Sequence, residues 1–558
     1  MHLEIYKESK YKILTLTLLF FVGVLEMFGL SLVYPFIAIL FEINLGGEEL
    51  IERITSLLTY FKLPISQYYL CLYIALVLLA KALLVTSYNY VINLSNIAYM
   101  INIRERIYLA SFKTEFGYVS DKISRLINGL TIMSQSAGGA MNLQFRILLN
   151  FIILFFLLIL GFLISWKMLL VALSIGAGIF LLLKFTITLS KVLGERIATL
   201  NEGLFRNLNQ GLSNYRYLKS TSTYGHFYDD LKPTLADIFK VQLRFVLIKH
   251  GTNALTEPLM VVSLSVIIFL SLYLLGISMA AIIVMYIVLG RFYSQLILLT
   301  NNIQEYQREH VAAVYCNDLI KEMQQSYEIP GKTSYRGNLN KTLSVKNITF
   351  GFENKLFFEN AEMDIDKNKI TLISGPSGSG KSTLLNIILG LLNPKEGQVL
   401  IDDKEIKEFD RDDLRKQIGL VTQENSLFDM TLRENLSLRN PGVLDSELIG
   451  FIKKFRLESI FDGEINLDYR INESSSNLSG GEKQRICLIR ELVAKPSILI
   501  LDEFTSSLDK ETLEIVISSI SELKGSITII IVSHQLEYLD LADKVYFVEN
   551  NSLVEKKD

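Results

Sequence analysis

The sequence predicts a multi-domain chain in which an all-α membrane domain of six helices precedes a soluble α/β domain. Composition is the first observation: 50% of the 558 residues are hydrophobic, 20% are charged, and the mean hydropathy of +0.33 is too high for an ordinary soluble protein of this length. The second is a series of six long apolar runs before residue 300. The third is a change after about Glu328, where short strand-like runs begin to alternate with helical ones.

The apolar runs are the expected membrane helices. Each can span a hydrocarbon core of roughly 30 Å, and the first continues far beyond the apolar region of a signal peptide. Together they predict a membrane domain of residues 1–325, joined by a linker at 326–337 to a soluble domain at 338–558. The six runs lie at about 13–41, 68–98, 139–165, 168–188, 256–275 and 278–299.

Lysine and arginine are distributed unevenly between the connections, which predicts the orientation. Residues 1–12, 99–135 and 189–250 contain three, five and nine of them, whereas residues 42–66 contain two. Because cytoplasmic connections carry an excess of these residues, we expect a multi-pass protein of the cytoplasmic (inner) membrane with both termini, both long loops and the soluble domain on the cytoplasmic side. The outer connection contains an amphipathic segment, Leu50–Phe61, which would lie on the membrane surface or pack on neighbouring helices.

Several ionisable side chains fall within the expected spans. A charge at bilayer depth costs at least ~2.5–3.5 kcal/mol unless it faces protein or water. Taken singly, each of these residues could equally have a structural partner, but together they favour a polar pathway through the membrane domain. They are Glu26, Lys81, Arg146, Lys184, Glu257 and Arg291.

Charge and cysteine content exclude other classes of site. Residues 1–330 carry 26 Lys and Arg against 21 Asp and Glu, and the remainder carries 29 against 37, so a basic membrane half precedes an acidic soluble half. This pattern does not indicate a nucleic-acid partner. Cys71, Cys316 and Cys487 are widely separated and follow no metal-ligand spacing, so neither a disulfide framework nor a zinc site is predicted.

A glycine-rich loop is the strongest chemical signal in the soluble domain. It follows the strand-like residues Ile370–Ser374 and precedes a helical run, which is the context that a phosphate-binding P-loop requires. Glycines let successive backbone N–H groups close around phosphates at a helix N-terminus, while Lys381 reaches the β- and γ-phosphates and Ser382 offers its hydroxyl to Mg²⁺. We therefore expect ATP and Mg²⁺ as cofactors. The expected contacts of this loop are Gly375, Pro376, Ser377, Gly378, Ser379, Gly380, Lys381, Ser382 and Thr383.

Two acidic residues follow a second strand-like segment, Ile498–Leu501. Asp502 is expected to bind Mg²⁺, and Glu503 to orient and polarise the attacking water beside the γ-phosphate. Between this pair and the P-loop, residues 478–485 begin another helix with two glycines, a start that is suited to an anion.

The order and spacing of these motifs resemble the ABC transporter family. Three further residues complete the pattern: Gln423 and His534 each follow an expected strand, and Asp509 follows the acidic pair. Alone, each of the three would be interpreted as a surface or capping residue. The resemblance covers the whole chain, because six spans with two long cytoplasmic loops ahead of one nucleotide-binding domain is the layout of an exporter half-transporter.

The resemblance implies roles for particular residues. Two copies would pair head to tail, with each ATP held between the P-loop of one copy and the signature motif, Leu478–Glu482, of the other. Short coupling helices would lie near Phe112–Val119 and Asn214–Ser222. Glu503, His534 and Gln423 would be catalytic, and Phe352 would stack on adenine, where the family usually has Tyr. The remaining implied contacts are Ser479, Gly480, Gly481 and Asp509 to nucleotide and Ser382, Gln423 and Asp502 to Mg²⁺.

The sequence departs from the family pattern at two places. Glu482 stands where Gln is commoner, and residues 471–477 replace a glycine-rich stretch that contacts the coupling helices. No catalytic position is missing. The intact set favours a homodimer with two active sites.

The substrate is predicted from the first span. Residues Gly23–Phe36 resemble the first span of bacterial lipid-linked oligosaccharide flippases, so a lipid-linked oligosaccharide or related amphipathic lipid is the first expectation. Arg146 and Arg291 would then hold the anionic head group, and membrane lipids would be further partners. Export of a peptide, such as an antimicrobial peptide, or of a drug is the alternative. A membrane-anchored regulatory ATPase would leave the six spans and the intramembrane charges unexplained.

Overall fold

The computed structural model contains two compact units. The first comprises Met1–Thr114 and Tyr118–Tyr327, and the second Glu115–Gly117 and Glu328–Asp558. A helical unit and a unit with two β-sheets confirm the predicted fold class. The structure describes residues 11–40, 49–273, 279–337, 339–352, 355–423, 426–461, 463–472, 477–504, 510–533 and 538–556, apart from the side chains of 49–50, 175, 177–183, 257, 273, 279–280 and 510–512.

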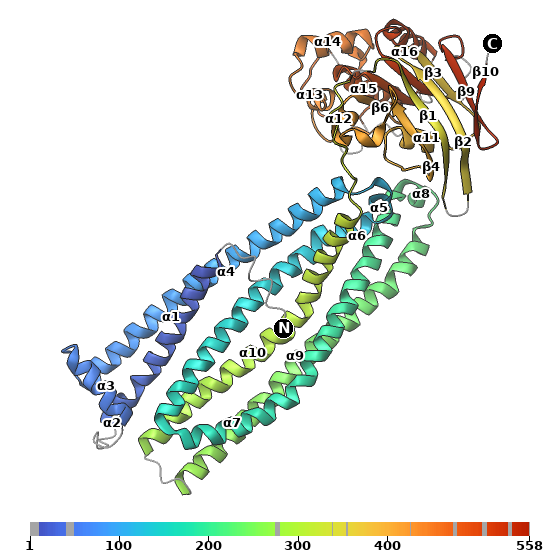
Figure 1. The fold of residues 1–558 in the computed structure, drawn as a ribbon. Coiled ribbons are helices and arrows are strands. Elements are labelled where there is room, and N and C mark those ends of the chain that lie inside the picture. Colours follow the sequence, from blue (N-terminus) through green and yellow to red (C-terminus); the bar gives the residue numbers. More distant parts are fainter. Residues whose placement is uncertain are drawn as a thin grey trace. The chain divides into compact units, whose positions relative to one another are not determined.

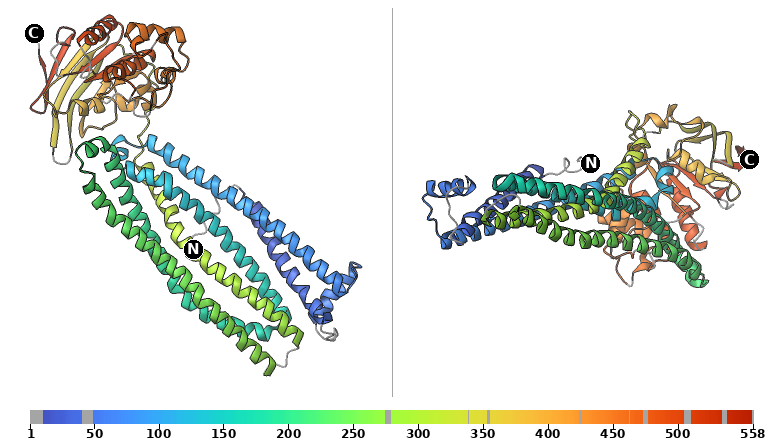
Figure 2. Two further views of the ribbon diagram at one scale, coloured as in Figure 1. Left: turned by 180° about the vertical axis from the view of Figure 1, so that it is seen from behind. Right: turned by 90° about the horizontal axis from the view of Figure 1, so that it is seen from below.

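The part of the chain before residue 328 is helical. Its long helices run side by side as a bundle, as Figure 1 and the views in Figure 2 show. The helices are α1 (Lys12–Ser31), α2 (Val33–Leu40), α3 (Glu49–Tyr60), α4 (Gln67–Lys113), α5 (Phe116–Asp121), α6 (Ile123–Asn128), the π-helix η2 (Gly129–Met133), α7 (Ser134–Ser213), α8 (Tyr215–Ser220), α9 (Tyr224–Tyr273) and α10 (Met279–Gln325). Helix α5 overlaps the segment Phe112–Val119, and α8 lies within Asn214–Ser222, the two segments in which coupling helices are expected.

Helix α7 contains two of the expected membrane spans. Its backbone leaves helical geometry at Ser165, with φ −162° and ψ 104°, so two helices meet there at one extended residue. By length and composition, five segments of the described chain could cross a membrane. The expected span at 168–188 is not among them, and it includes side chains at 177–183 that lie outside the described part. The five are Lys12–Leu40, Gln67–Lys113, Ile123–Ser174, Tyr224–Leu272 and Ala281–Gln325.

The amphipathic segment of the outer connection forms α3, which lies beside α2 at one end of the bundle (Figure 1). Ile51 and Leu58 are buried in two clusters that include residues of neighbouring helices. Leu57 and, just beyond the helix, Phe61 are exposed. The apolar face is therefore divided, because one part packs on neighbouring helices and the other is free to meet a membrane surface.

The second unit contains two sheets. An antiparallel sheet has the strand order β2-β1-β4-β5, and a six-stranded sheet has the order β10-β9-β3-β8-β7-β6, in which only the pairing of β10 with β9 is antiparallel. The strands are β1 (Thr342–Phe352), β2 (Lys355–Asp366), β3 (Ile370–Ser374), β4 (Glu396–Ile401), β5 (Lys404–Glu405), β6 (Ile418–Val421), β7 (Ile498–Asp502), β8 (Thr528–Val532), β9 (Lys544–Glu549) and β10 (Ser552–Lys556).

The second unit also contains helices, which pack against the two sheets and against one another. They are α11 (Lys381–Ile388), η3 (Ile406–Glu408), α12 (Arg411–Lys416), α13 (Leu432–Ser437), α14 (Asp445–Lys454), η4 (Glu458–Ile460), α15 (Gly480–Val493) and α16 (Lys510–Leu523). Ile529 and Ile531 of β8 join one buried cluster with α15 and α16, whereas Ile530 and Val532 join another with α11. The sheet is thus buried on both faces, as parallel sheets are. Its parallel strands end at one edge, where loops that bind ligands are expected.

Candidate functional site

The P-loop connects β3 to α11 and has a backbone that requires glycine. Gly378 and Gly380 have φ angles of +76° and +104°, a region that other residues rarely adopt. At Gly380 an added Cβ would also lie 2.8 Å from Cδ1 of Phe357. Gly380 caps α11, so the unpaired N–H groups of the first helical turn point into the loop. This geometry is suited to phosphate groups.

Lys381 occupies the inside of this loop. Its side chain is 7% exposed, and its ammonium donates hydrogen bonds of 3.0 Å to the carbonyl oxygens of Gly375 and Pro376. Oε1 of Glu503 lies 3.9 Å from the same ammonium. Phosphate oxygens are stronger acceptors than neutral carbonyls and can replace them as partners of the ammonium. The Lys381 ammonium therefore lies where it can bind the phosphates of a nucleotide.

A hydroxyl and a carboxylate meet beside the loop. The Ser382 hydroxyl donates a hydrogen bond of 3.3 Å to Oδ2 of Asp502, the last residue of β7. Burial raises the pKa of Asp502, and the neighbouring Glu503 adds to the rise. Oxygen ligands beside a carboxylate whose charge is poorly compensated fit Mg²⁺. Ser382 and Asp502 would hold the ion, which would neutralise charge on the phosphates.

Glu503 begins the loop after β7 in an unusual backbone conformation. Its φ of +46° lies in the left-handed region, which costs of order 1–3 kcal/mol for a residue other than glycine. The N–H of Glu503 donates a hydrogen bond of 2.9 Å to the carbonyl of Val532 in β8, which holds this conformation. The carboxylate consequently stands at the same edge of the sheet as Lys381.

The signature segment forms the N-terminus of α15. The Ser479 hydroxyl accepts a hydrogen bond from the N–H of Glu482 at 3.3 Å, and the Glu482 carboxylate accepts one from the N–H of Ser479 at 2.7 Å. This reciprocal capping box accepts either Glu or Gln at its third position, which explains why Glu482 is compatible with the motif. Ser479 and Gly480 are exposed and therefore accessible to another molecule.

Some of the other residues predicted to bind nucleotide lie in the described part of the chain, and others do not. Phe352 ends β1 and is 56% exposed, with its ring edge-on to those of Phe350 and Phe357. Gln423 follows β6 and is exposed. The P-loop residues Pro376, Ser377, Ser379 and Thr383 lie in the loop and the first turn of α11 with the residues already described. Asp509, His534 and part of the segment before the signature, 473–476, lie outside the described residues.

Sequence reasoning missed Lys355. This lysine starts β2 opposite Phe352, and its ammonium donates a hydrogen bond of 3.2 Å to the carbonyl of Gly378 in the P-loop. The same ammonium lies 4.7 Å from the centre of the Phe357 ring. No motif marks this lysine. Only the register of β1 against β2 reveals that it links the β1–β2 hairpin to the P-loop.

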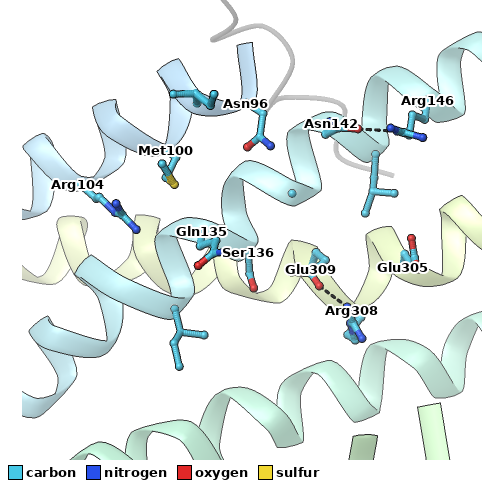
Figure 3. A pocket seen from close by; sticks show the side chains of 14 residues that line it. Asn96, Met100, Arg104, Gln135, Ser136, Asn142, Arg146, Glu305, Arg308 and Glu309 are labelled. Carbon is cyan, nitrogen blue, oxygen red and sulfur yellow. Dashed lines mark hydrogen bonds and ion pairs between the residues drawn. The ribbon is translucent and has the colours of Figure 1, made fainter. Parts of the chain in front are cut away.

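A cavity of about 930 Å³, here named the larger cavity, opens between α4, α7 and α10 of the first unit (Figure 3). Its carboxylates are paired, Glu305 with Lys249 and Glu309 with Arg308. Two arginines on its wall have only neutral partners among the described residues: Arg104 donates to the Ser134 hydroxyl and to the Thr131 carbonyl, and Arg146 donates to Oδ1 of Asn142. The wall therefore carries uncompensated positive charge. Sequence reasoning missed Arg104 because it lies beyond the apolar run of its helix.

A smaller cavity of about 490 Å³ is lined by residues of α1, α4, α7 and α10, and Arg146 lines both cavities. Lys81 and Arg291 lie on its wall and both pair with the buried carboxylate of Glu26. Four of the six ionisable residues singled out from the sequence thus meet in one place. Lys184 lines neither cavity, and the side chain of Glu257 lies outside the described part.

Comparison with known proteins agrees with both units. Residues 12–297 match the family model described as the ABC transporter transmembrane region, and residues 358–506 match the one described as ABC transporter. The chain is 30% identical over 325 residues to the alpha-hemolysin translocation ATP-binding protein HlyB of Escherichia coli O6:H1 and to the leukotoxin translocation ATP-binding protein LktB of Mannheimia glucosida. Each match covers 57% of this chain and 45% of the relative, so the chain spans less than half the length of these proteins.

A solved structure shares the fold. The structure of a bacterial Atm1-family ABC exporter with ATP bound has a TM-score of 0.82 to this chain, with 97% of this chain and 94% of that chain covered. At 18% sequence identity this likeness shows the fold alone.

Proposed function

Because the chain belongs to the ABC transporter family, we propose that it uses ATP hydrolysis to move an amphipathic substrate with an anionic head group across the cytoplasmic membrane. The observation that carries the substrate proposal is the pair of cavities that share Arg146, in which Arg104 and Arg146 have only neutral partners among the described residues. Burying a guanidinium charge costs free energy, and an anion that binds to the guanidinium in the cavity offsets part of that cost.

In the nucleotide-binding unit, each residue has a proposed part. The P-loop N–H groups and Lys381 bind the phosphates, Ser382 and Asp502 hold Mg²⁺ together with Gln423, and Phe352 offers its ring face to adenine. Glu503 orients the water that attacks the γ-phosphate, and His534 contacts that phosphate. The meeting of Lys381, Ser382, Asp502 and Glu503 at one sheet edge supports these assignments.

The active form is a homodimer in this proposal. Ser479 and Gly480 present a capped and exposed helix start, which suits contact with the nucleotide of a second copy. Asp509 would lie at the same interface. Every catalytic position of the family pattern is occupied in the sequence, so both sites of a homodimer would be active.

A lipid-linked oligosaccharide is the substrate that we favour. Its pyrophosphate would be bound by the basic cavity walls, and its long apolar tail would remain in the lipid. The exposed apolar side chains at α3, Leu57 and Phe61, offer that tail a surface at one end of the bundle. The nucleotide-binding unit and both termini would lie on the cytoplasmic side, in agreement with the distribution of Lys and Arg.

Peptide or protein export is the second candidate. The names of HlyB and LktB describe translocation of alpha-hemolysin and leukotoxin, and an acidic peptide would also suit the basic cavities. Drug export, the other alternative from the sequence, is favoured by no additional observation.

Transport by purified full-length protein in proteoliposomes distinguishes these candidates. The liposomes would be offered a polyprenyl-pyrophosphate glycan or a panel of hydrophobic and acidic peptides, with and without ATP. We expect ATP-dependent movement of the glycan lipid, and none with the Glu503→Gln variant. Transport of peptides alone, with the glycan lipid inert, would replace the flippase proposal by peptide export.

A further inference from the structure

The smaller cavity has an unequal number of opposite charges around it. Three cations line it, Lys81, Arg146 and Arg291, and no acidic side chain is among its lining residues. The carboxylate of Glu26 pairs with two of these cations and is itself only 3% exposed. Among the described side chains, this leaves a net charge of two positive units at the cavity.

Glu26 connects three helices at this point. It stands on α1, receives the Lys81 ammonium from α4, and accepts a hydrogen bond of 2.6 Å from Nε of Arg291 on α10. A carboxylate with two cations is not a neutral ion pair, because one positive unit remains. Arg146 on α7 adds the second, since the side chain to which it donates is the neutral Asn142.

A second observation indicates that a polar ligand belongs in this cavity. Tyr88 lines the wall and is 1% exposed, yet its hydroxyl has no hydrogen-bond partner among the described residues. A buried hydroxyl without a partner is costly, and a ligand oxygen in the cavity would satisfy it. Three cations and a hydroxyl without a partner, all on residues that line one cavity, form an arrangement that suits a phosphate group.

We infer that Glu26 is the counterion that sets the substrate charge, so that the cavity prefers a head group with two negative charges over one with a single charge. This inference rests on the proposed function for its cargo and specifies that cargo further. A pyrophosphate diester carries two negative charges at neutral pH, and it would neutralise the cavity. A phosphodiester would leave one positive unit unpaired. Glu26 acts through Lys81 and Arg291, so it is a positioning residue that need not touch the ligand.

Binding to full-length protein in nanodiscs without ATP tests the inference. Three ligands share a geranylgeranyl tail and one N-acetylglucosamine, and differ in having a pyrophosphate, a phosphate or no phosphate between them. For the wild-type protein we expect affinity to fall at least about tenfold at each step, because close charge pairs in binding sites couple by that much or more. Equal affinities for the three ligands would overturn the inference.

Variants separate the counterion from a structural role. Glu26→Gln adds one uncompensated positive unit, so the phosphate ligand should bind about tenfold more tightly and the pyrophosphate ligand, with twice the charge, should gain still more, while the neutral ligand is unaffected. If Glu26→Gln impairs folding, Glu26→Gln/Lys81→Gln restores the wild-type charge and should restore the wild-type ligand preference. Glu195, an exposed partner of Lys191 on α7, provides the matched control Glu195→Gln, which should change nothing.

The outcomes are distinct. Loss of affinity for all three ligands in the folded Glu26 variants, or no change for the charged ones, would show that Glu26 only supports the packing of α1. Charge-selective binding without ATP-driven transport would retain the counterion and reject the proposed function. If the pyrophosphate ligand is transported and Glu26→Gln does not change its transport, the proposed function is retained and the counterion role of Glu26 is rejected.

Discussion

The Ser382 hydroxyl donates a hydrogen bond to Oδ2 of Asp502 across 3.3 Å, although the residues are 120 positions apart in the chain. The bond joins the first turn of α11 to the end of β7. It is the polar link from which a Mg²⁺ site can be built, because both partners are oxygen ligands. Without the ion, the buried and ionised carboxylate of Asp502 destabilises the folded protein.

Replacing Asp502 by Asn should stabilise the nucleotide-free protein at neutral pH. Burial raises the pKa of Asp502, so the folded protein binds this proton more tightly than the unfolded chain does. The stability that this provides is complete below the ordinary value of 3.8 and is lost as pH rises through the raised pKa of the folded state. Asp502→Asn should therefore raise the apparent melting temperature at pH 7 and weaken the fall of the melting temperature as pH rises above 3.8.

The same variant should lose ATP hydrolysis, since the amide is a weak ligand for Mg²⁺. Thermal unfolding of the full chain without nucleotide, across a pH series, checks the first part. Ser382→Ala serves as the control, because it removes the partner and keeps the buried charge. A melting temperature that falls in Asp502→Asn would mean that the ionised carboxylate stabilises the folded protein, which is the opposite of what its raised pKa implies.

Replacing Glu503 by Gln should preserve ATP binding and lower ATP turnover by ~10²–10⁴-fold, the usual contribution of a positioned base. The amide is of similar size, so the left-handed backbone and its bond to Val532 would be kept. Lys381→Ala should instead weaken binding of the phosphates. Steady-state hydrolysis and equilibrium binding of ATP separate the two effects, and undiminished hydrolysis in Glu503→Gln would remove Glu503 from the mechanism.

The P-loop could be predicted because its signal is local. The strand-like Ile370–Ser374 coincides with β3, and the glycines after it occupy conformations that few other residues adopt. Hydropathy predicts where the membrane helices lie in the sequence, but it does not predict the residues at which they begin and end. The expected run at 68–98 lies inside α4, which continues to Lys113. Hydropathy reports the apolar part of a helix, whereas a helix that leaves the membrane keeps its backbone hydrogen bonds without any apolar run.

Contacts between spans could not be predicted in the same way. Glu26, Lys81 and Arg291 are each visible in the sequence as charges within apolar runs, but their pairing depends on which helices pack together. A single sequence does not show which helices are neighbours in the bundle. Lys355 is similar, since its position beside the P-loop follows from strand register and not from a motif.

Replacing Lys355 by Ala should raise the KM for ATP by roughly two- to tenfold, which corresponds to the loss of about one hydrogen bond. Its ammonium holds the carbonyl of Gly378 and the ring of Phe357, and so keeps the hairpin that carries Phe352 against the P-loop. The kcat should change little, because the P-loop itself and Glu503 are unaltered. Initial rates over a range of ATP concentrations give both constants.

Two comparisons make the Lys355 result specific. Lys355→Arg should retain most of the affinity, since a guanidinium can donate to the same carbonyl. Lys404→Ala removes an exposed lysine from β5 of the same sheet and should leave KM unchanged. Equal loss of kcat and affinity in Lys355→Ala would assign the effect to a general disturbance of the unit.

The start of α15 distinguishes capping from charge. Ser479 and Glu482 satisfy each other's backbone N–H groups, so Ser479→Ala should cost about 1 kcal/mol of stability. Glu482→Gln should be nearly neutral in thermal unfolding and in ATP hydrolysis, because the Gln oxygen can accept the same N–H of Ser479. Glu482→Ala leaves that N–H without its partner and should destabilise the helix start. If Glu482→Gln were as harmful as Glu482→Ala, the negative charge at the helix N-terminus, and not the hydrogen bond, would be what the motif requires.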